Sequence, residues 1–129
     1  MEKIQTLKIE SFSNSGDGIA KSDGFVIFVE NALPDEVVKV EITKENKHFA
    51  RGKILEIIKP SIHRTKPFCH LYNACGACSL QYVDYDYQIE LKKSIVKDAM
   101  KNIGNIDIEP DKVIPSPDIK EFRCKIQYP

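Results

Sequence analysis

The sequence lacks any apolar run that approaches the length of about 18 residues needed to cross a membrane. We therefore expect no membrane-spanning segment and no membrane partner. The first ten residues mix charged and apolar types, which excludes a secretory signal peptide and favours a cytoplasmic protein. Net charge is also absent, because 19 Lys and Arg balance 19 Asp and Glu. Any case for nucleic-acid binding must therefore rest on local clusters of charge.

Cysteine is scarce and unevenly distributed. Of the four cysteines, Cys69, Cys75 and Cys78 fall within ten residues, while Cys124 stands apart. Four cysteines would permit two disulfides in a secreted chain, but the lack of a signal peptide and the tight spacing argue against that interpretation. A metal or cluster site in a reducing compartment is favoured. The rest of the composition, 42% apolar and 29% charged over 129 residues, is ordinary for one or two compact domains.

Residues 1–58 have the pattern of short strands separated by turns. Alternation or apolar runs of strand length occur around 7–10, 25–29, 38–42 and 49–58. Gly, Asp and Pro mark turns at 16–18, 22–24 and 33–35. On the last strand we expect one face to carry Arg51, Lys53, Leu55 and Ile57. Five short strands with regular turns predict a small all-β barrel, whose closure removes exposed strand edges.

A polar connector bounded by prolines divides the chain at 60–67. We therefore expect a barrel domain over 1–59, a linker over 60–67 and a second domain over 68–129. With only about 60 residues, the second domain has little core of its own. We expect it to be less ordered than the barrel or to associate with a second copy of the chain.

The second domain contains one strong helical pattern and one strand pattern. Apolar residues recur at helical spacing from about Tyr85 to Ile103, and Asp84 is placed to cap the start of that helix. The segment 106–117 is rich in proline and indicates a loop, with room for one short strand. Clean alternation over 122–128 then predicts a half-buried strand. Such a strand needs partners, so we expect the chain to be part of a longer protein.

Basic residues gather in one stretch of this neutral chain. Between Lys44 and Lys66 there are seven Lys or Arg and only two acidic residues. We select Lys47, Arg51 and Lys53 as the first candidates for RNA contact, because such side chains neutralise phosphates. Nearby aromatic rings could stack on bases, namely those of Phe25, Phe28 and Phe49. The alternative is that Phe25, Ile27 and Val29 fill the barrel and the charges form a solvated face.

The cysteine spacing indicates thiolate ligation of one centre. Five residues separate Cys69 from Cys75, and a two-residue gap with a glycine separates Cys75 from Cys78. Such a gap lets two thiolates reach one metal from a tight turn, and thiolates favour iron–sulfur clusters and zinc. Either centre takes four ligands. Cys124 could be the fourth, or His70 in a zinc site. Cys124, however, lies on the apolar face of the predicted strand, where a cysteine also serves as a small core residue.

These features together resemble one family. The turn-rich barrel is followed by a C-x5-C-G-x-C pattern, by Leu80-Gln81-Tyr82 and by a helix that carries lysines. The chain is similar to the N-terminal portion of S-adenosylmethionine-dependent RNA uracil-5-methyltransferases, of the 23S rRNA type, that carry an N-terminal TRAM domain. Residues 1–58 resemble that TRAM domain, an OB-like RNA-binding barrel. The segment 122–125 resembles the family's aromatic-Arg-Asn-Lys segment, with cysteine in place of asparagine.

The resemblance implies a fold that is mainly β with one helix. A five-stranded OB-like (TRAM) β-barrel would be followed by part of a small α+β iron–sulfur domain. It also implies that three cysteines bind a [4Fe–4S] cluster, namely Cys69, Cys75 and Cys78. In the family the fourth cluster ligand lies further downstream than this chain extends.

The resemblance further implies a substrate and a missing domain. The parent enzyme methylates C5 of uridine in ribosomal or transfer RNA, so RNA is the expected partner. The C-terminal methyltransferase domain, which uses S-adenosylmethionine, is absent, and no catalytic residue can be placed on this chain. Two residues of the last strand could add RNA contacts, Arg123 and Lys125, although salt bridges with neighbouring acids are an equal alternative.

Two other hypotheses compete with this one. The chain could be a self-contained RNA-binding module with a structural zinc site of four cysteines, including Cys124. It could also belong to the radical methylthiotransferases, which carry a TRAM domain as well. Their C-x3-C-x2-C motif and the position of their TRAM domain at the other end both argue against that assignment.

Overall fold

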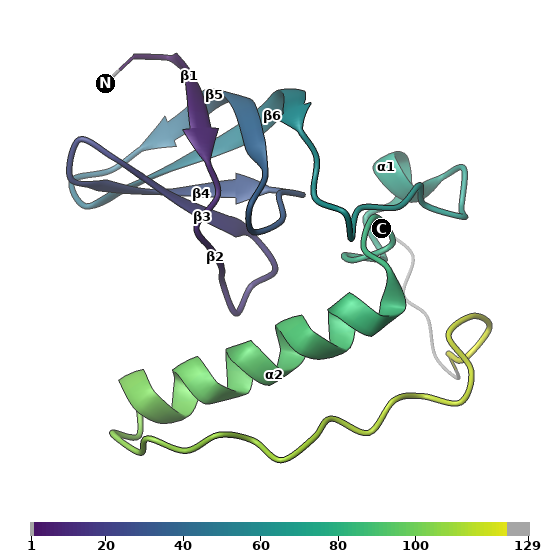
Figure 1. Ribbon diagram of the computed structural model, residues 1–129. Coiled ribbons are helices and arrows are strands. Elements are labelled where there is room, and N and C mark those ends of the chain that lie inside the picture. The colour runs from purple at the N-terminus through teal and green to yellow at the C-terminus, as the bar shows by residue number, and fades with distance from the viewer. Residues whose placement is uncertain (1, 124–129) are drawn as a thin grey trace. The chain divides into compact units, whose positions relative to one another are not determined.

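The computed structural model describes residues 2–123 and contains two compact units, 1–64 and 65–129 (Figure 1). The division between them falls inside the segment 60–67 that was predicted as a linker. Within the described residues, neither helix combines the length and the apolar character that a membrane span requires.

The first unit is a single sheet of six strands that curls into a barrel (Figure 1). The strands are β1 (Ile4–Lys8), β2 (Ser11–Phe12), β3 (Gly18–Ser22), β4 (Phe25–Glu30), β5 (Val37–Glu45) and β6 (Phe49–Lys59). Their order across the sheet is β1-β5-β6-β4-β3-β2. All neighbouring pairs are antiparallel except β4 and β6, which run parallel.

The N-terminal segment closes the barrel because it serves both edges of the sheet. β1 pairs with β5, and β2 pairs with β3 at the opposite edge. Between them, Ile9 N donates to Glu36 O at 2.9 Å and Glu10 N donates to Ile19 O at 2.8 Å. The expectation of five strands was wrong by one. The additional strand is β2, a two-residue element that forms where the chain turns from one edge to the other.

The barrel core follows the alternation of the sequence. Ile27 and Val29 on β4 face inward, as do Val38 and Val40 on β5, and all four are fully buried. One part of the pattern was predicted incorrectly. Ile57 does not share the outer face with Arg51 but packs against the core beside Ile54. The β5–β6 register shifts three times. One shift leaves Leu55 as an extra residue on β6 between Ile54 and Glu56, and this bulge turns the side chain of Ile57 toward the core.

Strand β6 requires a glycine at position 52, where it lies against β5. A Cβ atom at Gly52 would collide with the side chain of Val40 on β5 and lie 3.0 Å from the carbonyl oxygen of Glu41. The absence of a side chain therefore lets β5 and β6 approach closely at the centre of the sheet.

A buried carboxylate joins the end of the first unit to the barrel. Glu36 is fully buried and accepts hydrogen bonds from Leu33 N at 2.7 Å and Ser61 N at 3.1 Å. Arg64 donates to it through Nε at 2.7 Å and Nη2 at 2.8 Å, and Nη2 also donates to Asn31 O at 2.6 Å. The segment 61–64 is thereby held against the β4–β5 turn. This bidentate pair satisfies a charge whose burial would otherwise be very unfavourable.

The described part of the second unit, residues 65–123, contains two helices where one was predicted. The long helix α2 (Tyr85–Asn102) begins as expected, with Asp84 as its N-cap accepting from Tyr87 N at 2.9 Å. The additional helix is α1 (Tyr72–Cys75), a single turn inside the cysteine segment. After α2 the chain runs back along the helix (Figure 1), where Glu109 forms ion pairs with Lys93 and Lys97. The described part of this segment contains no strand, and the strand predicted over 122–128 lies mostly outside the described residues.

Substitution of Glu36 by glutamine should destabilise the barrel strongly. The change leaves the half-buried Arg64 guanidinium without its counter-charge, and breaking a pair with a buried member costs about 3–5 kcal/mol. Urea unfolding followed by far-UV circular dichroism measures the loss. A suitable control is Lys53→Gln, because that lysine is 61% exposed in its 3.7 Å pair with Glu41. The control should change stability by less than about 1 kcal/mol. Equal effects of the two variants would contradict the assigned role of Glu36.

Acid should remove the contribution of Glu36 to stability. Burial raises the pKa of Glu36, but hydrogen bonds from Arg64, Leu33 and Ser61 and the Arg64 charge outweigh burial and hold the pKa below its usual value. The stabilisation is therefore present above the pKa of an unfolded glutamate and is lost as the pH falls through the folded pKa. The stability difference between the wild type and Glu36→Gln should shrink below about pH 4. A difference that stays constant down to acid pH would contradict this linkage.

Candidate functional site

Two aromatic rings meet on the outer face of the barrel. The parallel pairing of β4 with β6 sets Val26 opposite Phe49 and Phe28 opposite Arg51. The rings of Phe28 and Phe49 meet edge to face, with centroids 5.8 Å apart and planes at 82°. Both residues are half-buried, so each ring is supported by the sheet and retains an accessible part. The pair thus forms a rigid apolar surface.

Arg51 completes this surface with a positive charge. Its guanidinium carbon lies 5.6 Å from the centroid of the Phe28 ring, within the range of a cation–π contact. Its Nη1 lies 3.2 Å from Oδ2 of Asp17, which reaches over from the β2–β3 turn. We name Phe28, Phe49 and Arg51 the aromatic platform. Rings stack on nucleobases of any sequence, and a planar guanidinium pairs with phosphate, so the platform offers both contacts that single-stranded nucleic acid needs.

The other cations selected from the sequence lie on the same sheet but not at the rings. Lys47 is exposed in the turn between β5 and β6, and Lys44, also exposed, pairs in register with Arg51. Lys53 lies further along β6 in acidic surroundings. It stands in register with Glu30 and Glu41, and it forms an ion pair with the latter at 3.7 Å. The structure therefore brings Arg51 to the rings and sets Lys53 among carboxylates.

The three clustered cysteines lie on one segment of the second unit. Cys75 ends α1 and is exposed, whereas Cys69 and Cys78 are half-buried, and none of the three is in a disulfide. Gly76 follows with φ of 72°, a left-handed conformation that confirms the backbone freedom expected there.

The thiols fit a thiolate-bound centre by their chemistry but not by their arrangement. Thiolates are the ligands that iron–sulfur clusters and zinc prefer. Within residues 2–123, however, no three His, Cys, Asp or Glu side chains come close enough together to hold a metal ion. Cys124, the other proposed ligand, lies outside the described residues. A metal centre in this segment would therefore require the three thiols to lie closer together than they do in this structure.

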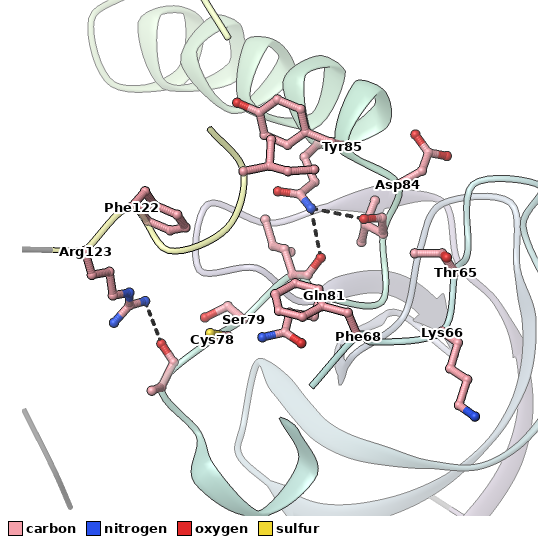
Figure 2. Close-up of a pocket in the computed structure, with 15 residues that line it drawn as sticks. Thr65, Lys66, Phe68, Cys78, Ser79, Gln81, Asp84, Tyr85, Phe122 and Arg123 are labelled. Carbon is pink, nitrogen blue, oxygen red and sulfur yellow. Dashed lines mark hydrogen bonds between the residues drawn. The ribbon is translucent and has the colours of Figure 1, made fainter. Parts of the chain in front are cut away.

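A cavity of about 520 Å³ adjoins the cysteine segment in the second unit (Figure 2). Cys78 lines it together with the aromatic rings of Phe68, Tyr85 and Phe122. Figure 2 also shows Arg123, whose Nη2 donates to Ala77 O at 2.9 Å. The predicted RNA contact Arg123 thus touches the backbone between two of the cysteines. Lys125, the other predicted contact on that strand, lies outside the described residues.

Two residues of these arrangements were not selected from the sequence. Asp17 was interpreted only as a turn residue, although it forms the ion pair with Arg51. Glu36 carried no signal, because an acid next to a turn is most often solvated. Each of these acids forms an ion pair with an arginine that lies at least 28 positions away in the sequence.

Comparison with known proteins identifies relatives of both units. Residues 2–55 match the TRAM domain family. The chain is 42% identical to an RNA methyltransferase of Clostridium tetani, over 95% of this chain and 27% of that protein. It is 38% identical to the 23S rRNA (uracil(1939)-C(5))-methyltransferase of Vibrio campbellii, over 81% of this chain and 24% of that protein. The chain thus spans about a quarter of the length of the curated relatives it matches.

One solved structure shares the fold over both units. It is the tRNA (uracil-54, C5)-methyltransferase of Pyrococcus abyssi in complex with S-adenosyl-L-homocysteine. The two chains are 26% identical with a TM-score of 0.54, and the match covers 88% of this chain and 24% of that one.

The exposure of the thiols predicts their order of reaction. In the metal-free chain, iodoacetamide should modify Cys75 faster than Cys69 or Cys78, because only Cys75 is exposed. Mass spectrometry of peptides after brief alkylation measures the three rates. Equal rates at the three positions would show that the segment does not hold the described conformation in solution.

Proposed function

We propose, on the premise that this chain belongs to the TRAM-domain RNA methyltransferases, that it is the RNA-recognition part of an enzyme that methylates C5 of uridine. The aromatic platform is the observation that carries this proposal. It lies on the unit that matches the TRAM domain, and it combines two stacking rings with a guanidinium. These groups suit unpaired nucleotides, whose bases are free to stack while a phosphate meets the cation.

Methyl transfer belongs to the remainder of the enzyme. Relatives three to four times longer carry names that specify RNA methyltransferase activity, and one was crystallised with S-adenosyl-L-homocysteine. We assign the use of S-adenosylmethionine to the full-length cytoplasmic protein and no catalytic step to the residues of this chain. Ribosomal RNA is the favoured substrate, because the relative named for 23S rRNA is 38% identical and the one named for tRNA is 26% identical.

The cysteine segment supports a second part of the proposal. Cys69, Cys75 and Cys78 would bind a [4Fe–4S] cluster whose fourth ligand lies outside the described residues. The supporting observation is the donor set: three thiols within ten residues, none in a disulfide, around a left-handed glycine. Binding would draw the thiols together and stiffen a unit that has few fully buried side chains. We assign the cluster a structural role, because methyl transfer to uracil needs no electron transfer.

Binding of single-stranded RNA tests the platform directly. We expect Phe28→Leu to weaken binding of a labelled oligouridylate by about 5- to 150-fold, because one stacked base contributes about 1–3 kcal/mol. Arg51→Gln should weaken binding and reduce the slope of log affinity against log salt by about one. Fluorescence anisotropy at several salt concentrations measures both quantities.

The matched control for these variants is Lys39→Gln. Lys39 is exposed on β5, in register with Thr6 and Glu56 and away from the rings. Its loss should change affinity by no more than about twofold. If Phe28→Leu, with the barrel still folded by circular dichroism, has no larger effect than the control, the platform does not bind RNA.

Metal analysis tests the cluster. After strictly anaerobic purification we expect about four iron and four sulfide per chain, with no zinc. Cys78→Ser should remove the iron, whereas Cys124→Ser should leave it in place, because Cys124 is not a ligand in this proposal. One zinc per chain that disappears in Cys124→Ser would instead establish the self-contained zinc module.

A further inference from the structure

We propose that Asp17 makes the aromatic platform selective for unpaired RNA over duplex RNA, because its carboxylate occupies the place on Arg51 that an RNA phosphate would take. This inference rests on the proposed RNA-binding function and specifies which RNA the platform accepts. Asp17 would be a specificity-determining residue that acts through Arg51.

The β2–β3 turn holds Asp17 in a fixed position. Ser13 N donates to Asp17 O at 2.8 Å, and Asp17 N donates back to the hydroxyl of Ser13 at 3.1 Å. That hydroxyl lies 2.9 Å from the hydroxyl of Ser15, which donates to the Asp17 carboxylate at 3.3 Å. Gly16, with φ of 92°, supplies the left-handed residue that the turn requires. The carboxylate is therefore presented to Arg51 by a turn with its own hydrogen bonds, not by a freely moving side chain.

The ion pair is asymmetric in its exposure. The side chain of Asp17 is 13% exposed, whereas that of Arg51 is 42% exposed. The pair is joined by a single contact of 3.2 Å, and the guanidinium also faces the Phe28 ring. Arg51 thus remains accessible to a ligand, but its charge is already partly neutralised. A phosphate that approaches Arg51 meets a carboxylate that cannot easily move away.

The consequence differs between the two forms of RNA. Duplex RNA offers phosphates, but its bases are stacked inside the helix. When a duplex phosphate contacts Arg51, it replaces the Asp17 carboxylate as the partner of the guanidinium and lies close to that carboxylate. The contact therefore adds little binding free energy. Single-stranded RNA lays a base on Phe28 and Phe49, and its flexible backbone can then bring a phosphate to the exposed side of Arg51, away from Asp17. The Asp17 carboxylate therefore opposes the rigid backbone of the duplex more than that of the single strand, and this difference makes Arg51 a selective contact.

The test compares two ligands, a single-stranded oligouridylate and an RNA duplex of the same length, on the complete 129-residue chain. In Asp17→Asn we expect duplex affinity to rise about tenfold and single-strand affinity about twofold, so the preference for the single strand falls about fivefold. The salt slope for duplex binding should steepen by about one as Arg51 gains a phosphate. Asparagine is nearly isosteric with aspartate, and circular dichroism verifies the fold.

Two controls separate the proposed role from a general effect of charge. Glu30→Gln removes one negative charge from the exposed end of β4, two residues from Phe28, and should change both affinities by the same small factor. In the Arg51→Gln background, Asp17→Asn should no longer alter the preference, because the proposed effect passes through Arg51.

The outcomes distinguish this inference from the function on which it rests. If single-strand binding depends on Phe28 but Asp17→Asn raises both affinities equally, or retains its effect without Arg51, the selectivity role is wrong and the platform stands. If Asp17→Asn weakens single-strand binding, Asp17 merely orients Arg51 and the inference is also wrong. If neither ligand binds in a way that depends on Phe28 or Arg51, the proposed function and this inference both fail.

Discussion

Strand β6 is paired along both of its edges, and the barrel and its outer face both depend on this double pairing. On one side β6 runs antiparallel to β5, and on the other it runs parallel to β4. Gly52 lets the strand pass close to β5, because no Cβ fits beside Val40. The parallel pairing brings Phe28 next to Arg51, two residues that are far apart in the sequence. The surface to which we assign RNA binding is therefore a direct product of the β4–β6 pairing at the centre of the sheet.

A charged pair fixes the point where the barrel ends. Glu36 is buried among the turns at one end of the sheet, and Arg64 reaches it from the segment that follows β6. Replacing a buried ion pair by apolar residues can be neutral for stability, whereas removing one partner is severe. We interpret the pair as a device of specificity, because only one path of residues 61–64 satisfies both the carboxylate and the guanidinium. The hydrogen bonds between Glu36 and Arg64 thus fix the path of the chain as it leaves the barrel.

Local signals predicted much of the fold, and long-range pairing limited the rest. An apolar run located β4, alternation located β5, and Asp84 identified the start of α2, because each signal lies within a few neighbouring residues. The inward turn of Ile57 was missed because it depends on a shift in the β5–β6 register at Leu55, which no local pattern records. β2 was missed because two residues carry no periodicity. The family resemblance agrees with the match to TRAM and with relatives named RNA methyltransferase.

The candidate site shows the same division. The sequence selected Arg51 and both rings as separate candidates for RNA contact, but it could not show that they touch, because parallel pairing across the barrel has no sequence signal. It could not show that Asp17 is the partner of Arg51 for the same reason. For the cysteines, spacing predicted the ligand set but not the conformation of the segment. The thiols remain apart in the described structure, and the gathering of three thiols around a centre stays a prediction.

Nuclear magnetic resonance titration of the labelled chain with single-stranded RNA tests the central claim most directly. The claim is that RNA binds to the outer face of β4 and β6. We predict that the largest amide shifts fall at 26–30, at 49–53 and in the turn at 46–48, with little change in α2. Shifts confined to the second unit, or spread evenly over all basic residues, would contradict the account. Shifts confined to the second unit would place RNA recognition there. Evenly spread shifts would indicate nonspecific electrostatic binding.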